Sequence, residues 1–305
     1  MSQALARTVG ELMIDEPAVV DPDDTLDVAR SIMMLADSRH VPVVRGGRLE
    51  GIVSERDLLA AQLPRTRTRD QDREAHLHSL RVREVMTLEP RCARPDQSVE
   101  EAAALMRQHR ISCLPVTRGQ ELLGIVTTTD LVALATDRMW MSGGPVAVSR
   151  LMTPRPLVSA KPTDRLDLAE LLMRFGHLRH LPVLDGGRLV GMLSDRDILA
   201  AVRSRLERLS PAERLQDRAS VRVDEIMTRD PWTTQPDEDA AQAGRRLLEH
   251  RIGALPVLRK RRLSGMLSET DFLSYLIDAD PGASFAWSRG RVANSARSRR
   301  PRANF

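Results

Sequence analysis

The sequence of 305 residues predicts an α+β protein built from four copies of one β-α-β-β-α unit. The first observation is a ladder in which a proline, a second proline, a glycine and an aspartate recur at intervals of twenty, nine and six residues. Its four copies are Pro22-Pro42-Gly51-Asp57, Pro95-Pro115-Gly124-Asp130, Pro162-Pro182-Gly191-Asp197 and Pro236-Pro256-Gly265-Asp271. Because every copy keeps the spacing without a gap, we interpret the chain as an array of repeats.

A second observation is that two versions of the repeat sequence alternate along the chain. Repeats 1 and 3 share Arg-His-x-Pro-Val at 39–43 and 179–183 and Gly-Gly-Arg-Leu at 46–49 and 186–189. Repeats 2 and 4 instead share His-Arg-Ile, at 109–111 and 250–252. The duplicated object is therefore a pair, which predicts two tandem modules of two repeats each.

The third observation is the order of local patterns within each unit. A segment ending in a hydrophobic residue and Met leads to a short apolar stretch and the first proline. Apolar residues at helical spacing follow, as at Leu26, Ala29 and Met33, with Thr25 as a helix cap. A strand then carries the second proline, and Gly46-Gly47 suits the positive φ angles of a tight hairpin. A second strand ends at a hydroxyl residue, where the last helix begins.

These patterns predict the domain boundaries. The repeats span 8–61, 81–135, 147–202 and 221–277, and each is too small to bury much core alone. Long polar connections, 62–80 and 203–220, lie inside the modules. The connection between modules, Thr136 to Pro145, is shorter.

Composition restricts the class of protein. With one Tyr, four Phe and three Trp, the core must be built from aliphatic residues, Met and Ala. The sequence has no apolar run near the roughly 20 residues that span a bilayer and no signal-peptide pattern at its start. Cys92 and Cys113 lack CxxC spacing, which is typical of free thiols in a reduced compartment. We expect a cytoplasmic protein without membrane insertion.

The basic charge comes from a C-terminal tail. Residues 281–305 hold six arginines and no acid, whereas the whole chain has a formal net charge of +4, so the remainder is slightly acidic. This composition predicts a disordered tail. It is either a solvated extension or a weak contact for nucleic acid through counterion release.

Taken together, the hydrophobic-Met-Thr segment, the hydrophobic-Pro-Val strand and the Gly-x-x-Ser/Thr-x-x-Asp motif resemble the CBS domain, named after cystathionine β-synthase. The resemblance covers all four repeats. It implies that the repeats form tandem pairs, called Bateman modules, and that two such modules assemble into a flat disc. It also implies adenosyl ligands: the aspartate holds ribose hydroxyls, the Ser/Thr contacts ribose or phosphate, and adenine lies against the hydrophobic-Pro strand.

The Ser/Thr-x-x-Asp motif has two physical interpretations. A hydroxyl residue followed by an acid three residues later is a capping box, so helix capping alone explains it. The same helix start also suits a nucleotide, because its free N–H groups favour phosphate and the carboxylate accepts ribose hydroxyls. The candidate residues are Ser54 with Asp57, Thr127 with Asp130, Ser194 with Asp197 and Ser268 with Asp271.

Phosphate also needs cations, and here the repeats differ. Arg56 and Arg196 precede the aspartate in repeats 1 and 3, which also carry His40 and His180. We therefore expect repeats 1 and 3 to supply the tighter, charge-dependent sites. The alternative is that both arginines point to solvent.

The sequence lacks a phosphate loop, a nucleophile elbow and a metal-binding helix motif, and its histidines form no ligand cluster. We expect no enzyme, no metal site and no required cofactor. The predicted function is a stand-alone regulatory protein that binds an adenine nucleotide, with or without Mg²⁺, and acts on a protein partner in trans. A homodimer is compatible with this view. The alternative is a structural or assembly module whose ligand sites are vestigial.

Overall fold

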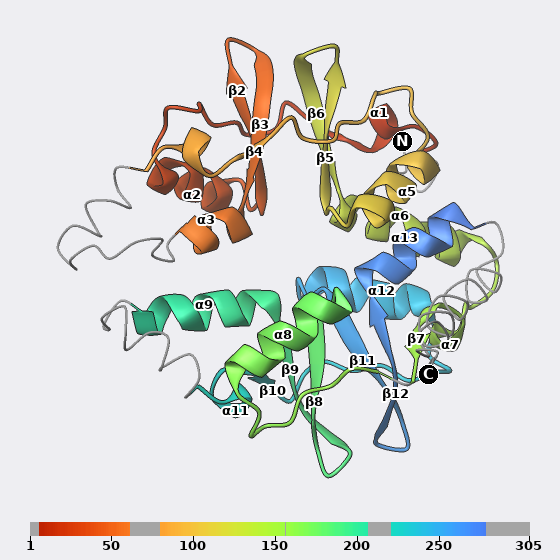
Figure 1. Ribbon diagram of the computed structural model, residues 1–305. Helices are drawn as coiled ribbons and strands as arrows, with labels where there is room; N and C mark the ends of the chain where they lie inside the picture. The colour runs from red at the N-terminus through yellow and green to blue at the C-terminus, as the bar shows by residue number, and fades with distance from the viewer. Residues whose placement is uncertain (1–5, 62–79, 156, 207–220, 279–305) are drawn as a thin grey trace, which may run out of the picture.

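The computed structural model describes residues 6–61, 80–155, 157–206 and 221–278 (Figure 1). Repeats 1 and 2 form module 1, repeats 3 and 4 form module 2, and each module has one six-stranded sheet. The two modules face each other through their helices, and the hairpins point away at opposite ends (Figure 1). The predicted organisation into two pairs is therefore confirmed.

The repeats share one order of elements. Repeat 1 consists of α1 (Val9–Leu12), β1 (Ile14–Asp15), α2 (Leu26–Leu35), β2 (His40–Arg45), β3 (Arg48–Ser54) and α3 (Glu55–Ala61). Repeat 2 consists of η2 (Val82–Glu84), β4 (Thr87–Leu88), α5 (Val99–His109), β5 (Cys113–Arg118), β6 (Glu121–Thr127) and α6 (Thr128–Met141). Repeat 3 consists of α7 (Val148–Leu151), β7 (Thr153–Pro154), α8 (Leu166–Gly176), β8 (His180–Asp185), β9 (Arg188–Ser194) and α9 (Asp195–Leu206). Repeat 4 consists of α11 (Val223–Ile226), β10 (Thr228–Arg229), α12 (Ala240–Glu249), β11 (Ala254–Arg259), β12 (Arg262–Ser268) and α13 (Glu269–Ile277).

The leading segment of each repeat crosses to the other repeat of its module. β1 pairs with β6 and β4 pairs with β3, and module 2 repeats this exchange with β7 on β12 and β10 on β9. The methionine before each short strand then covers the ladder glycine of the partner repeat. A Cβ on Gly51 would lie 2.8 Å from Met86 Sδ and 2.8 Å from the Thr87 carbonyl oxygen. The glycine is therefore needed because the exchanged segment lies directly against it.

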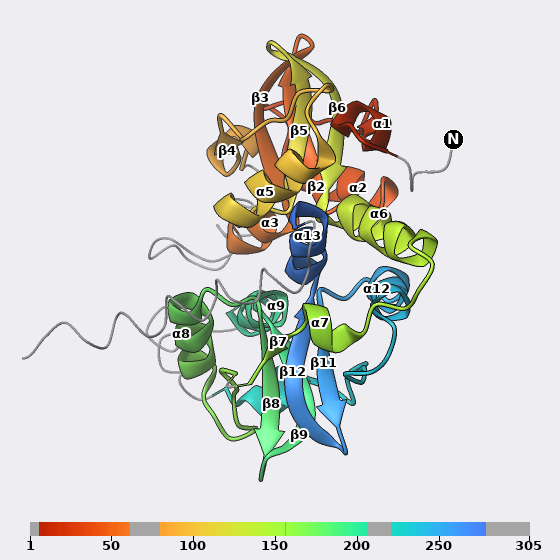
Figure 2. The ribbon, with the colours of Figure 1, turned by 90° about the vertical axis from the view of Figure 1, so that its right-hand side faces the viewer.

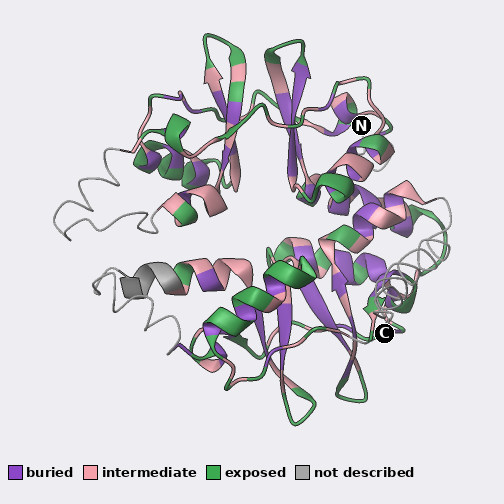
Figure 3. Ribbon diagram, viewed as in Figure 1, coloured by how far each residue is buried: buried purple, intermediate pink, exposed green. Residues whose placement is uncertain are grey.

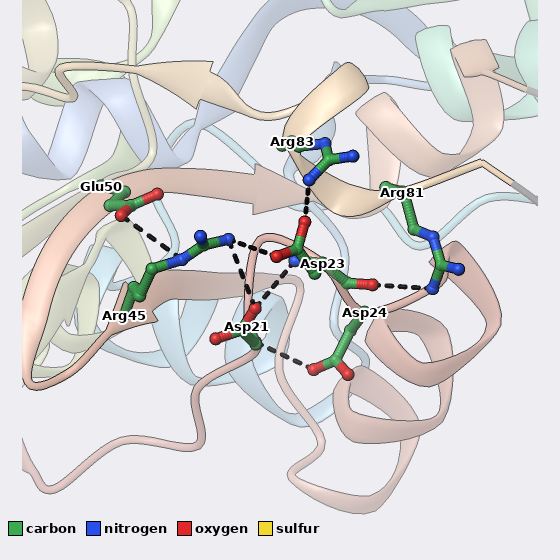
Figure 4. Close-up of polar contacts among 7 residues, drawn as sticks. All are labelled: Asp21, Asp23, Asp24, Arg45, Glu50, Arg81 and Arg83. Carbon is green, nitrogen blue, oxygen red and sulfur yellow. Dashed lines mark hydrogen bonds and ion pairs between the residues drawn. The ribbon is translucent and has the colours of Figure 1, made fainter.

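A polar network on the outside of repeat 1 joins the exchanged segment of repeat 2 to repeat 1 (Figure 4). Arg83 of repeat 2 pairs with the Asp23 carboxylate, and Arg81 Nη1 donates to the Asp23 carbonyl oxygen at 2.8 Å. Arg45 also reaches the Asp23 carboxylate, at 2.7 Å. These side chains are about half exposed, so we expect the network to contribute to orientation more than to stability.

Local predictions hold in the hairpins and at one cap. Gly46 and Gly47 have φ values of +57° and +81°, as the predicted tight turn requires. Thr25 caps α2 by accepting from the Val28 N–H. The apolar stretch before the first proline is reduced to a parallel bridge, Val20 with Val43 in repeat 1, which places it beside the proline strand of its own repeat.

The modules are joined mainly through repeats 2 and 4. Helices α5, α6, α12 and α13 pack together, and we call this contact the even interface (Figure 2). One hydrophobic cluster runs through it from repeat 2 to repeat 4, and it includes the fully buried Leu134 and Phe272. Gly244 allows the close approach, because a Cβ there would meet the Thr136 hydroxyl of module 1 and would lie 2.8 Å from Phe272 Cε1 of its own repeat.

The even interface corrects one predicted boundary. The connection between modules was expected to begin at Thr136, but α6 continues as a helix to Met141. Thr136 is buried and donates to the Val132 carbonyl oxygen, and its side chain lies against Gly244. Arg245 of α12 lies 4.5 Å from the Trp140 ring centroid. The last turns of α6 are therefore stabilised by packing that the local sequence does not indicate.

Repeats 1 and 3 meet more loosely. Their main helix contact is α3 with α9, which we call the odd interface, and their hydrophobic cores are two separate clusters. The burial pattern shows the difference: the described helices on the even side are more buried than α8 of repeat 3 (Figure 3). One helix position explains part of it, because the buried Ala103 and Gly244 of the even repeats are replaced by exposed Arg30 and Glu170 in the odd repeats.

Within the described residues, no helix is long and apolar enough to cross a membrane. The arginine tail, 281–305, and nearly all of the two long connections lie outside the described residues. The predictions made for them stay predictions.

Candidate functional site

The four Ser/Thr-x-x-Asp motifs all form capping boxes. Asp57 Oδ2 accepts from Ser54 N at 2.8 Å and from Ser54 Oγ at 2.6 Å. The same two bonds join Thr127 to Asp130, at 2.7 and 2.8 Å, and they recur at Ser194–Asp197 and Ser268–Asp271. The capping interpretation of the motif is therefore confirmed.

Helix capping uses only part of the hydrogen-bonding capacity of each aspartate carboxylate. In each box the accepting atom is Oδ2, so Oδ1 lies outside the box. A carboxylate has about four acceptor positions, which leaves capacity for two hydroxyl donors. The geometry thus permits both interpretations of the motif at once.

Asp57 lies in a cavity of about 480 Å³, which we call cleft 1. Ser54, Arg56 and Asp57 reach it from repeat 1, and Thr87 and Arg91 reach it from the leading segment of repeat 2. The strand exchange is the reason why residues of both repeats line one cleft. Its volume is within the range of small-molecule sites.

Asp130 lies in a second cavity of about 740 Å³, which we call cleft 2. Here the leading segment of repeat 1 supplies Ile14 at the position that Thr87 occupies in cleft 1. Met33, Met34 and Leu248 add further apolar surface. Burial raises the pKa of Asp130, against the hydrogen bonds from Thr127 that lower it. Cleft 2 is therefore larger, and an apolar side chain stands where cleft 1 has the Thr87 hydroxyl.

Arg56 and Arg196 do not point to open solvent. Both line cleft 1, and they form reciprocal ion pairs across the odd interface. Arg56 Nη2 lies 2.5 Å from Asp195 Oδ2, and Arg196 Nε lies 3.5 Å from Glu55 Oε2. The Nε atoms of both arginines are buried and have no hydrogen-bond partner within the part of the chain that the structure describes.

The two histidines that begin the proline strands β2 and β8 are held neutral. Burial, together with the nearby positive charges of Arg39 and Arg56, lowers the pKa of His40 to about 4. Burial also lowers the pKa of His180 to about 4. His40 Nε2 lies 3.0 Å from Ser112 Oγ, and the His180 ring lies against Gly253. At neutral pH these side chains offer hydrogen bonds rather than positive charge.

In module 2 the motif residues occupy equivalent places. Ser194, Arg196 and Asp197 begin α9, and Ser268 and Asp271 begin α13. Burial outweighs the hydrogen bonds from Ser268 and Thr153 and raises the pKa of Asp271 to about 6. Thr153 belongs to the leading segment of repeat 3, so the arrangement of Thr87 with Asp57 recurs here.

Thr87, Arg39 and Arg179 are among the residues of cleft 1 that sequence reasoning did not assign to the site. A signal for each was present. A threonine follows the methionine of the leading segment in three repeats. An arginine precedes His40 and His180 in both odd repeats. What could not be read from the sequence is that Arg179, from module 2, enters a cleft of module 1. Among the described residues, no group of three His, Cys, Asp or Glu side chains forms a metal site.

Comparison with known proteins agrees with this architecture. The profile of the CBS domain matches residues 9–64, 82–137, 148–204 and 223–278. The chain belongs to the CBS domain family. Over 117 residues it is 35% identical to the CBS domain-containing protein YhcV of Bacillus subtilis, a match that covers 38% of this chain and 81% of YhcV.

Two relatives in Methanocaldococcus jannaschii match more of the chain. Protein MJ1404 is 27% identical over 291 residues, which are 93% of this chain and 65% of that protein. The crystal structure of MJ1225, a proposed archaeal homolog of g-AMPK, has a TM-score of 0.68 at 22% identity and covers 88% of this chain and 99% of that one. At this identity the likeness shows the fold: four CBS repeats in two pairs.

Proposed function

We propose that this CBS protein is a cytoplasmic regulator that binds an adenine nucleotide between paired repeats and signals to a protein partner in trans. The observation that carries the proposal is the composition of cleft 1. A carboxylate whose Oδ1 lies outside its capping box, a threonine hydroxyl and several arginines line one cavity of about 480 Å³. Hydroxyl-binding and phosphate-binding groups in one cleft suit a nucleotide.

The ribose is assigned to Asp57. A charged acceptor makes hydrogen bonds worth about 1.5–3 kcal/mol each, and Oδ1 is the atom outside the capping box. Thr87 is on the partner repeat and can contact the same ligand. We assign the weaker site to cleft 2, since Ile14 replaces the threonine there and Thr129 stands where repeat 1 has Arg56.

The signal would be a change in the arrangement of the repeats relative to one another. A ligand in cleft 1 touches repeats 1 and 2 of module 1 and also Arg179 and Arg196 of module 2. Binding therefore stabilises the arrangement in which these groups converge, and a partner that contacts both modules can detect that arrangement. The described residues belong to the four CBS repeats, so we assign any catalytic step to the partner.

The second candidate, a structural module with vestigial sites, also has a specific observation in its favour. All four aspartates are satisfied as helix caps without any ligand. Capping alone is therefore enough reason for the motif to persist.

Isothermal titration calorimetry with AMP, ADP, ATP and S-adenosylmethionine, each with and without Mg²⁺, separates the two candidates. We expect saturable binding, and a loss of about ten- to a hundredfold in affinity for Asp57→Asn because charged hydrogen bonds are removed. Asp96→Asn, at an exposed carboxylate outside the clefts, is the matched control. Absence of saturable binding at millimolar ligand would favour the structural module. Equal losses for Asp57→Asn and Asp130→Asn would contradict the ranking of the clefts.

A further inference from the structure

Clefts 1 and 2 meet at the centre of the molecule. Both are lined by Arg39, Arg179 and Arg196, and also by His40, Glu55 and Ser112. The contact of His40 Nε2 with Ser112 Oγ, at 3.0 Å, forms part of the wall between them. Two of the shared arginines, Arg179 and Arg196, belong to module 2, so the centre is built by both modules.

Cleft 1 has a strong excess of positive charge. Six arginines line it against three carboxylates, Glu55, Asp57 and Glu89. One of these carboxylates, Asp57, already accepts two hydrogen bonds in its capping box. Cleft 2 differs, because five arginines there face four carboxylates, which include Asp37 and Glu269. The excess of cations over anions is therefore concentrated in cleft 1.

The central arginines are crowded and only partly compensated. Arg179 Nη2 donates to the Arg110 carbonyl oxygen, and Arg39 Nη2 donates to the Arg251 carbonyl oxygen at 3.3 Å. Within the described residues neither guanidinium forms an ion pair with a carboxylate. Burial and the nearby Arg56 lower the pKa of Arg179, which indicates the same crowding of like charges. An anion placed here would relieve that repulsion.

The position of these arginines gives them a selective role. Asp57 and Thr87, which we assign to the ribose end, both belong to module 1, as does Arg56 beside them. Arg179 and Arg196 come from the opposite module and line the same cavity. A single phosphate next to the ribose is served by module 1, whereas a longer phosphate chain extends toward the arginines of module 2.

We propose that cleft 1 selects nucleotides with two or more phosphates, and that Arg179 and Arg196 of module 2 determine this preference. The proposal rests on the proposed nucleotide-binding function and names its ligand class. It ranks ATP and ADP above AMP. It places S-adenosylmethionine last, because that ligand has a sulfonium cation in place of a phosphate and would add positive charge to the arginine cluster.

The test compares affinities for ATP and AMP in the full chain and in the double variant Arg179→Gln, Arg196→Gln. We expect the unaltered protein to bind ATP at least about tenfold more tightly than AMP, since charge-assisted phosphate contacts are each worth about 1.5–3 kcal/mol. In the double variant the ATP affinity should fall by roughly tenfold or more, with a change below about threefold for AMP. Arg188→Gln, at an exposed arginine on the β8–β9 hairpin, is the matched control and should leave both affinities unchanged.

Two further measurements keep the outcome decisive. Inorganic tripolyphosphate should displace ATP from the unaltered protein and lose this effect in the double variant. Arg196→Lys, which retains the charge, should keep most of the preference and serves as a second variant if the double variant fails to fold. Equal affinities for ATP and AMP in the unaltered protein, or equal losses in the variant, would overturn the proposal. If no adenosine ligand binds at all, the nucleotide-binding function itself fails, which is a different result.

Discussion

Arg56 of module 1 lies 2.5 Å from the carboxylate of Asp195 in module 2, and this ion pair spans the odd interface. The neighbouring Arg196 and Glu55 form a second pair in the opposite sense, at 3.5 Å. Both arginines also line cleft 1. The groups that hold repeat 1 to repeat 3 are therefore the same groups that would meet a phosphate chain, which links ligand binding to the contact between modules.

Substitution of Asp195→Asn should raise the affinity for ATP. Asp195 competes with the ligand for Arg56, so its neutralisation leaves this arginine available to phosphate. We expect a gain of roughly three- to tenfold, because the pair is partly exposed and is worth about 1 kcal/mol. Calorimetry with ATP measures it, and Asp185→Asn, at an exposed hairpin carboxylate, is the control. A loss of ATP affinity would show that Asp195 positions Arg56 rather than competing for it.

Substitution of Gly51→Ala should destabilise module 1. The added Cβ would lie 2.8 Å from the Thr87 carbonyl oxygen, and this backbone atom can move only if the exchanged strand β4 shifts. We expect a loss of about 1–3 kcal/mol in the free energy of unfolding, as for other overpacked sites. Urea denaturation measures the loss. Gly144→Ala is the matched control, since nothing lies within 4 Å of its added Cβ, and equal stability of both variants would contradict the strand exchange.

Substitution of Gly244→Ala should weaken the even interface. Its Cβ would meet the Thr136 hydroxyl of module 1 and the Phe272 ring of α13. We expect the modules to separate more readily, with a loss of about 1–3 kcal/mol. Hydrogen exchange should show reduced protection in α6 and α13, with little change in β2 and β3. If protection changes equally throughout the chain, the even interface is not a separate contributor.

Stability should fall as the pH is lowered from about 6.5 toward 4. His40 and His180 have pKa values of about 4 in the folded protein, against 6.5 in an unfolded chain. The unfolded state therefore binds protons first, which favours unfolding across this window. Once both states are protonated, each histidine has lowered the stability by roughly 3 kcal/mol, since one pKa unit corresponds to about 1.4 kcal/mol. Asp271 opposes part of the effect below pH 6, because its raised pKa makes the folded state take up a proton there.

The difference between the unaltered protein and the double variant His40→Gln, His180→Gln isolates the histidine contribution. The fall in the denaturation midpoint between pH 7 and pH 5 should disappear in the variant, because it lacks both histidines, and the remaining effect of Asp271 has the opposite sign. An unchanged pH dependence in the variant would show that these two histidines are not responsible.

Features with a local cause were predictable from the sequence. Gly46-Gly47 indicated a tight hairpin, Thr25 indicated a helix start, and the capping box of Ser54 with Asp57 needed only residues three positions apart. The pairing of repeats was predictable too, because the segments 39–43 and 179–183 share a sequence pattern that repeats 2 and 4 lack.

Tertiary structure decided what depends on contacts between distant segments. The ladder glycine Gly51 was visible in the sequence, but its partner Met86 became apparent only with the strand exchange. The extension of α6 to Met141 depends on packing against α12, which no local pattern encodes. The same holds for Arg179: its charge is visible in the sequence, but its place in a cleft of the other module follows from how the two modules pack through the hydrophobic cluster shared by repeats 2 and 4. Sequence determined the repeat and its motif, and packing between repeats decided which residues share each cleft.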